Sequence, residues 1–206
     1  MRLRYRRKGF ALLAVIMLVA IMAILAAVIA PSTVRVLNDE RVDKAATSFE
    51  RLDSAVVRFK RTIMVYPGRL NHLAIPITTS DKNSCGNNYT LGQVNSWAGS
   101  VIDTVGGVYI ARPVPPGGLP LAGGLGYVRD SVSRKPAGAT GVLELVIITA
   151  TEGDAILLND RIDGIADYVA SNATDGNQTG KVRWTAPNAN RFVELTYNVI
   201  PPQMGC

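Results

Sequence analysis

Histidine and cysteine are scarce in this chain of 206 residues, which contains one histidine and two cysteines. This composition excludes metal centres built from several Cys and His side chains. A Ser-His-Asp triad would have to use His72, and the sequence has no Gly-x-Ser-x-Gly elbow, Walker loop or Gly-x-Gly-x-x-Gly motif. We therefore predict that the protein is not an enzyme, and that His72 is a solvated loop residue.

Aromatic residues are also few, at 6% of the chain, and the basic excess is confined to one end. Without the cations of the first nine residues, 17 basic side chains remain against 16 acidic ones. These cations are Arg2, Arg4, Arg6, Arg7 and Lys8. A protein that binds nucleic acid usually carries its positive charge in a patch on the folded domain. Nucleic acid is therefore excluded as a main ligand.

A long uncharged apolar run is present, and it follows these cations directly. It extends from Phe10 to Ala30, 21 residues without a charge. As a helix the run would be roughly 31 Å long, enough to cross a bilayer core. Cations before a span keep that end cytoplasmic, so we expect everything after Ala30 to lie across the membrane.

Three interpretations of this N-terminus are open. A secretory signal peptide would need cleavage after residues 28–30, where Pro31 makes a poor site. An ordinary single-span anchor needs no cleavage. In the third interpretation the chain is cut between Gly9 and Phe10, and the mature protein keeps the apolar run.

The third interpretation is supported by a family resemblance. The stretch Lys8-Gly9-Phe10-Ala11-Leu12-Leu13 resembles the leader junction of type IV prepilins and of the pseudopilins of type II secretion. The resemblance implies that a prepilin peptidase cuts after Gly9 and methylates the Phe10 amine. It also implies a helix bend at Pro31, where many pilins have proline. The chain departs from the family at Ala14, where a glutamate is usual.

Beyond the apolar run, the sequence predicts one amphipathic helix over residues 31–66. A stripe with helical spacing consists of Leu37, Arg41, Ala45, Phe49, Leu52, Val56, Phe59 and Ile63. Tyr66-Pro67-Gly68 should end the helix. We expect an irregular loop over 69–105, loop over 113–126, strands at 108–110, 141–150, 181–184 and 191–200, and a short helix at 154–162.

These elements together predict an α+β fold that is type IV pilin-like. Its long N-terminal helix, with a membrane half and an amphipathic half, should pack on a small antiparallel β-sheet. The predicted organisation is a leader over 1–9, a transmembrane or filament-core helix over 10–30, the amphipathic half over 31–66, and a globular α/β region over 67–206.

The sequence suggests two further sites, a disulfide that follows from the predicted periplasmic location and a calcium site in an acidic cluster. Cys85 and Cys206 would lie in an oxidising space, where a disulfide between them would persist, although two free thiols are the alternative. Asp160, Asp163, Asp167 and Asp175 lie among asparagines and glycines, as in a calcium loop, but their spacing fits no EF-hand. Some pseudopilins bind calcium in such loops, and a solvated polar surface is the other interpretation. No cofactor is required.

The resemblance implies a structural function. The protein would be a pseudopilin or minor pilin, at the tip or elsewhere, of a type IV pilus or a type II secretion pseudopilus. Its partners would be other pilin subunits, the prepilin peptidase and the inner-membrane assembly platform. It would first lie in the inner membrane as a single-pass protein with its C-terminal domain in the periplasm, and later in the filament. The alternative is a single-span periplasmic protein whose outer domain binds a ligand or partner.

Overall fold

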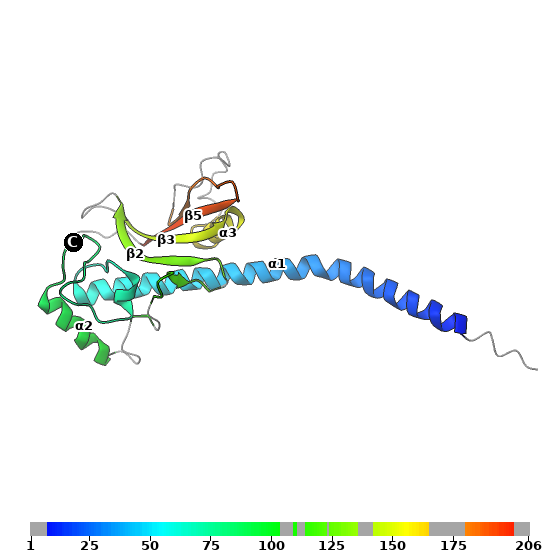
Figure 1. Ribbon diagram of the computed structural model, residues 1–206, viewed down its shortest axis with the longest axis horizontal. Coiled ribbons are helices and arrows are strands. Elements are labelled where there is room, and N and C mark those ends of the chain that lie inside the picture. The colour runs from blue at the N-terminus through cyan, green and yellow to red at the C-terminus, as the bar shows by residue number, and fades with distance from the viewer. Residues whose placement is uncertain are drawn as a thin grey trace, which may run out of the picture. The chain divides into compact units, whose positions relative to one another are not determined.

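The structure is a computed structural model that describes residues 8–103, 109–110, 114–122, 124–135, 142–164 and 180–199. The chain divides into two compact units, residues 1–40 and residues 41–206. One long helix, α1 (Lys8–Ile63), begins in the first unit and ends in the second (Figure 1). The domain boundaries proposed from the sequence remain predictions.

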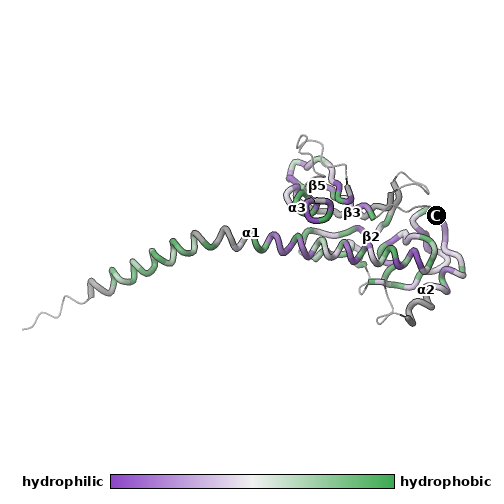
Figure 2. The backbone as a smooth tube through the Cα atoms, turned by 180° about the vertical axis from the view of Figure 1, so that it is seen from behind, coloured by the Kyte–Doolittle hydropathy of each residue, from purple (hydrophilic) through white to green (hydrophobic). Residues whose placement is uncertain are grey.

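The described part of the first unit is helix α1 alone. Its large apolar side chains are exposed, from Leu37 at 52% to Leu12 at 67%. Figure 2 shows this part of the helix as mostly hydrophobic, whereas polar and apolar residues alternate farther along α1. A helix that is apolar on all sides needs a partner that covers it, because it has no polar face to turn towards water.

The predicted fold class is wrong where it requires the first half of the long helix to span a membrane. Among the residues that the structure describes, no helix is long and apolar enough to cross a membrane. The corrected description is a mixed α+β fold with a long first helix.

In the second unit, the sheet has the strand order β1-β2-β3-β5-β4, and every neighbouring pair is antiparallel. Its strands are β1 (Leu119–Pro120), β2 (Tyr127–Lys135), β3 (Val142–Thr151), β4 (Val182–Trp184) and β5 (Phe192–Val199). The predicted strands at 141–150, 181–184 and 191–200 are thus found. Residues 109–110 form a bend and no strand, and β2 was not predicted.

One face of α1 packs on this sheet and supplies much of the core. The predicted stripe is buried from Ala45 to Ile63, with each member at most 2% exposed. Phe49 stacks on Tyr197 of β5, with ring centroids 4.6 Å apart. Leu37 lies in the first unit and is 52% exposed, so the stripe is buried only in the second unit.

Between α1 and the sheet, the chain forms a 3-10 turn, η1 (Leu70–Leu73), and a helix, α2 (Leu91–Asp103). The loop predicted over 69–105 is therefore wrong for α2. Thr90 and Gln93 form a capping box: Gln93 Oε1 accepts the Thr90 N–H at 2.9 Å, and Thr90 Oγ1 accepts the Gln93 N–H at 3.3 Å. Trp97 of this helix is 1% exposed, which anchors α2 to the core.

A short helix, α3 (Glu152–Ile162), follows β3 directly. Thr151 begins it, because its hydroxyl oxygen accepts the N–H of Asp154 at 3.1 Å. Ala155 and Leu158 are fully buried, and the helix lies against β3, β4 and β5. The helix predicted at 154–162 is confirmed, with its first residue two positions earlier.

The end of α1 generates a stability prediction. Met64 follows the helix with φ at 70°, a conformation that favours glycine, and its side chain is 72% exposed. The Met64 N–H still donates to the Lys60 carbonyl at 2.8 Å. Met64→Gly should therefore raise the free energy of unfolding by about 0.5–1 kcal/mol, because it removes backbone strain and loses little packing.

Urea denaturation of the full chain in mild detergent measures this difference. Met64→Ala is the control, because it also removes the long side chain but keeps the Cβ that causes the strain. Equal stability of the Gly and Ala variants would show that strain at residue 64 is not significant.

Candidate functional site

Among the described residues, the longest continuous exposed apolar surface is the first part of α1. Large hydrophobic side chains between residues 12 and 29 are each more than half exposed, and no charged residue lies among them. Burying each such side chain contributes roughly 1.5–3 kcal/mol. A surface of this kind marks a site of association with lipid or with other protein.

The residues predicted for processing lie at the start of this helix. Gly9, Phe10 and Pro31 are all within α1, and Ala14 is exposed on it. The predicted cleavage after Gly9, methylation of Phe10 and bend at Pro31 all stay predictions. At Ala14 the described helix offers a methyl group where the family usually offers a carboxylate.

The calcium and disulfide predictions are only partly within the described residues. Asp163 uses one carboxylate oxygen to accept the Val182 N–H at 2.7 Å, which joins the end of α3 to β4. Asp160 is half-buried on α3, and Asp167 and Asp175 lie outside the described residues. Within the described part of the chain, no three metal-ligating side chains are grouped. Cys85 is disulfide-bonded, and its predicted partner Cys206 lies outside the described residues.

His72 is buried, at 6% exposure, so the expectation of a solvated loop residue is wrong. Its Nδ1 lies 3.0 Å from the Tyr89 hydroxyl, and its Nε2 lies 3.9 Å from Oδ1 of Asp81. The His72 carbonyl accepts the indole N–H of Trp97 at 2.9 Å. His72 therefore holds α2 and the 81–89 segment together, a structural role that no local sequence signal indicates.

Burial lowers the pKa of His72 below its usual 6.5, against the opposing effect of the Asp81 and Asp130 carboxylates. Burial also raises the pKa of Tyr89, so its phenol stays protonated and can donate to the neutral ring. This cluster is a packing element of the second unit.

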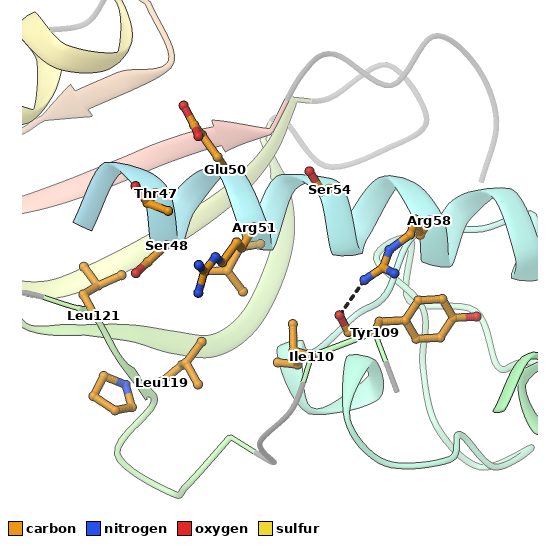
Figure 3. Close-up of a pocket in the computed structure, with 12 residues that line it drawn as sticks. Thr47, Ser48, Glu50, Arg51, Ser54, Arg58, Tyr109, Ile110, Leu119 and Leu121 are labelled. Carbon is orange, nitrogen blue, oxygen red and sulfur yellow. Dashed lines mark hydrogen bonds between the residues drawn. The ribbon is translucent and has the colours of Figure 1, made fainter. Parts of the chain in front are cut away.

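A groove of about 690 Å³ lies beside α1 in the second unit. Its lining residues are Thr47, Ser48, Glu50, Arg51, Leu52, Ser54, Arg58, Tyr109, Ile110, Leu119, Pro120 and Leu121. Figure 3 shows Arg51 and Ser48 directed towards Leu119 and Leu121, whereas Glu50 points to the other side of the helix. The groove therefore combines a cation with an apolar wall.

Arg58, the second arginine that lines the groove, makes one hydrogen bond within the chain. Arg58 donates to the Tyr109 carbonyl at 2.9 Å, which fixes the direction of its guanidinium (Figure 3). Arg51 has no ion pair within the described part of the chain. The sequence could not predict this groove, because its two walls are more than 50 residues apart.

The buried histidine generates a prediction on pH dependence. Because the pKa of His72 is lower in the folded than in the unfolded chain, the unfolded chain binds more protons below about pH 6.5. The free energy of unfolding should be unaffected above that pH and should fall as the pH is lowered from about 6.5 to 5. His72→Gln should flatten this dependence, because an amide does not titrate.

Thermal or urea unfolding at pH 7.5, 6.5, 5.5 and 5 measures the slope for both proteins. His72 is the only histidine of the chain, and the difference in slope between the two proteins isolates its contribution. An unchanged slope in His72→Gln would contradict the assignment. Tyr89→Phe is the matched control, because it removes a hydrogen bond from the same cluster and leaves the titrating ring in place.

Comparison with models of protein families, with curated proteins and with solved structures finds no match to this chain. The features of the chain that bear on function are the Gly9-Phe10 junction, the exposed apolar part of α1 and the groove beside α1.

Proposed function

We propose that this protein is a structural subunit, a pseudopilin or minor pilin, of a type IV pilus or a type II secretion pseudopilus. A prepilin peptidase would cut it after Gly9. The observation that carries this proposal is the exposed apolar surface of α1 between residues 12 and 29, which begins three residues after the Gly9-Phe10 junction. That junction resembles the prepilin cleavage site.

The exposed apolar surface of α1 between residues 12 and 29 is unfavourable in water and needs a partner that covers it. Side chains from Leu12 to Ile29 are exposed on all sides of α1, so no single contact on the same chain could cover them. Apolar helices of like subunits, packed side by side, would bury every face at once. The C-terminal half of α1 is already buried in its own unit and would carry that unit outside the bundle.

The remaining predictions on location and partners form part of this proposal. Before assembly the chain would be associated with the inner membrane, with residues 67–206 in the periplasm, and the assembly platform would transfer it to the filament. Catalysis and a required cofactor have no place in this function, and nucleic acid is not its main ligand.

A periplasmic protein that binds a ligand or partner through its outer domain is the second candidate. The groove between Arg51 and Leu119 favours it, because a groove that has both charged and apolar walls suits specific binding. The two candidates differ in processing. Only the first requires cleavage after Gly9 and a methyl group on the new amine.

Gly9→Val tests the proposed processing. A protease at the membrane surface must fit the residue before the cut, and glycine has no side chain to clash there. The variant should leave the full-length precursor in the membrane fraction, whereas the native chain should lose residues 1–9 and gain one methyl group. Intact-protein mass spectrometry of both measures this outcome.

Gly117→Val is the matched control, since an added Cβ at Gly117 meets no other atom within 4 Å. It should be processed like the native chain. Normal processing of Gly9→Val, or an unmodified native N-terminus, would reject the proposed function.

Ala14 leads to a second prediction, that the subunit is a tip or minor component. In the family, glutamate at this position is thought to pair with the terminal amine of a neighbouring subunit, and an unpaired amine among apolar helices is costly. Ala14 cannot provide this pairing to a subunit above it, and a tip subunit has none above it.

Quantitative mass spectrometry of purified filaments should find the chain at a small fraction of total subunits. Ala14→Glu should not improve assembly. A filament built mostly of this protein, or a clear gain with Ala14→Glu, would contradict the tip position.

A further inference from the structure

The groove beside α1 contains a cation, Arg51, that forms no ion pair with any of the described residues. Arg51 points into it, towards the apolar wall of Leu119 and Leu121, and the adjacent Glu50 points away (Figure 3). Arg58 lies seven residues farther along the same helix, about 10.5 Å by helical rise, and also lines the groove. The groove thus presents two guanidinium groups in line, with apolar side chains facing them.

The outer face of α3 presents the complementary pattern. Leu157 is 39% exposed, so the outer face of α3 presents one large apolar side chain. Asp154 and Asp160 lie three residues before and after it, so they flank Leu157 on either side of the helix face. By helical rise the two carboxylates are about 9 Å apart along the axis, close to the separation of the two arginines.

We propose that helix α3 of a second copy of this chain occupies the groove beside α1. Leu157 would contact Leu119 and Leu121, Asp160 would pair with Arg51, and Asp154 would pair with Arg58. This inference rests on the proposed function and names a contact between C-terminal units of neighbouring subunits.

The pairing follows from which groups are free. Asp160 and Arg51 have no ion pair within the residues that the structure describes. Asp154 already accepts the Thr151 hydroxyl, and Arg58 already donates to the Tyr109 carbonyl. A pair between Asp160 and Arg51 places α3 antiparallel to α1. In this orientation the dipoles of the two helices attract each other.

The geometry of this contact explains how it could repeat. The groove and α3 are different surfaces of one unit, so a contact between them is heterologous, and each copy keeps one groove and one helix available for the next. Contacts of this type build open chains unless the rotation closes a ring. Arg161 on α3 is held by Asp43 of its own chain at 2.7 Å, so it does not compete for the carboxylates.

Intermolecular photo-crosslinking tests the proposal with the full chain in detergent. Benzoylphenylalanine replaces Leu157 in an unlabelled copy, which is mixed with a copy uniformly labelled with ¹⁵N. We expect crosslinks from position 157 of one copy to residues 47–58 or 119–121 of the other, identified by peptide mass. Arg51→Glu in the labelled copy should lower their yield by at least about tenfold.

Two variants make the result specific. Arg61→Glu, an exposed arginine of α1 that does not line the groove, should leave the yield within about twofold. Combining Arg51→Glu in one copy with Asp160→Lys in the other should restore the crosslinks, which a merely misfolded variant could not do. Crosslinks to other regions, crosslinks only within one chain, or no restoration by the charge exchange would overturn the proposal.

The outcome is separate from that of the proposed function. Correct cleavage and methylation without these crosslinks would reject the α3 contact and retain the filament subunit. Crosslinks in a chain that is never processed would retain the contact and reject the pilin function.

Discussion

The packing of α1 on the sheet is the constraint on which the second unit depends. A continuous stripe from Ala45 to Ile63 is buried, and Phe49 lies directly on the ring of Tyr197. A polar pair fixes the register of this contact, because Lys181 Nζ, just before β4, lies 3.5 Å from Oδ2 of Asp53. Burial raises the pKa of Tyr197 in the same interface, which keeps its phenol uncharged beside the Asp53 carboxylate.

The same helix meets two opposite demands along its length. From Ala45 onward its apolar residues recur with a helical period, and one face suffices to bury them. Between residues 12 and 29 they occupy every face, and the described chain does not cover them. Burial of the second half of α1 therefore stabilises the fold. The apolar side chains of the first half would be removed from water only if the helix associated with lipid or with another protein.

The fold could be predicted where a signal is local. The period of the stripe, the apolar run of β3 and the turn residues before β5 all lie in short windows of sequence.

Strand β2 was not predicted because its register shifts between Val128 and Val132, so the alternation expected of a strand is broken there. The capping box at Thr90 and Gln93 is a local signal for the start of α2. Burial of His72 depends on Tyr89 and Trp97, so no pattern around residue 72 could reveal it. The membrane span was predicted from the uncharged run, the cations before it and the family resemblance, whereas no helix among the described residues is long and apolar enough to form it.

The outer strands of the sheet have a consequence for unwanted aggregation. β1 has two residues and β4 has three, and short strands at the margin of a sheet are one means by which proteins limit pairing with another chain. A protein whose copies gather at high local concentration would otherwise be exposed to uncontrolled strand pairing, the route to amyloid-like deposits. Short margins of this kind would favour side-chain contacts over strand pairing wherever copies of the chain associate.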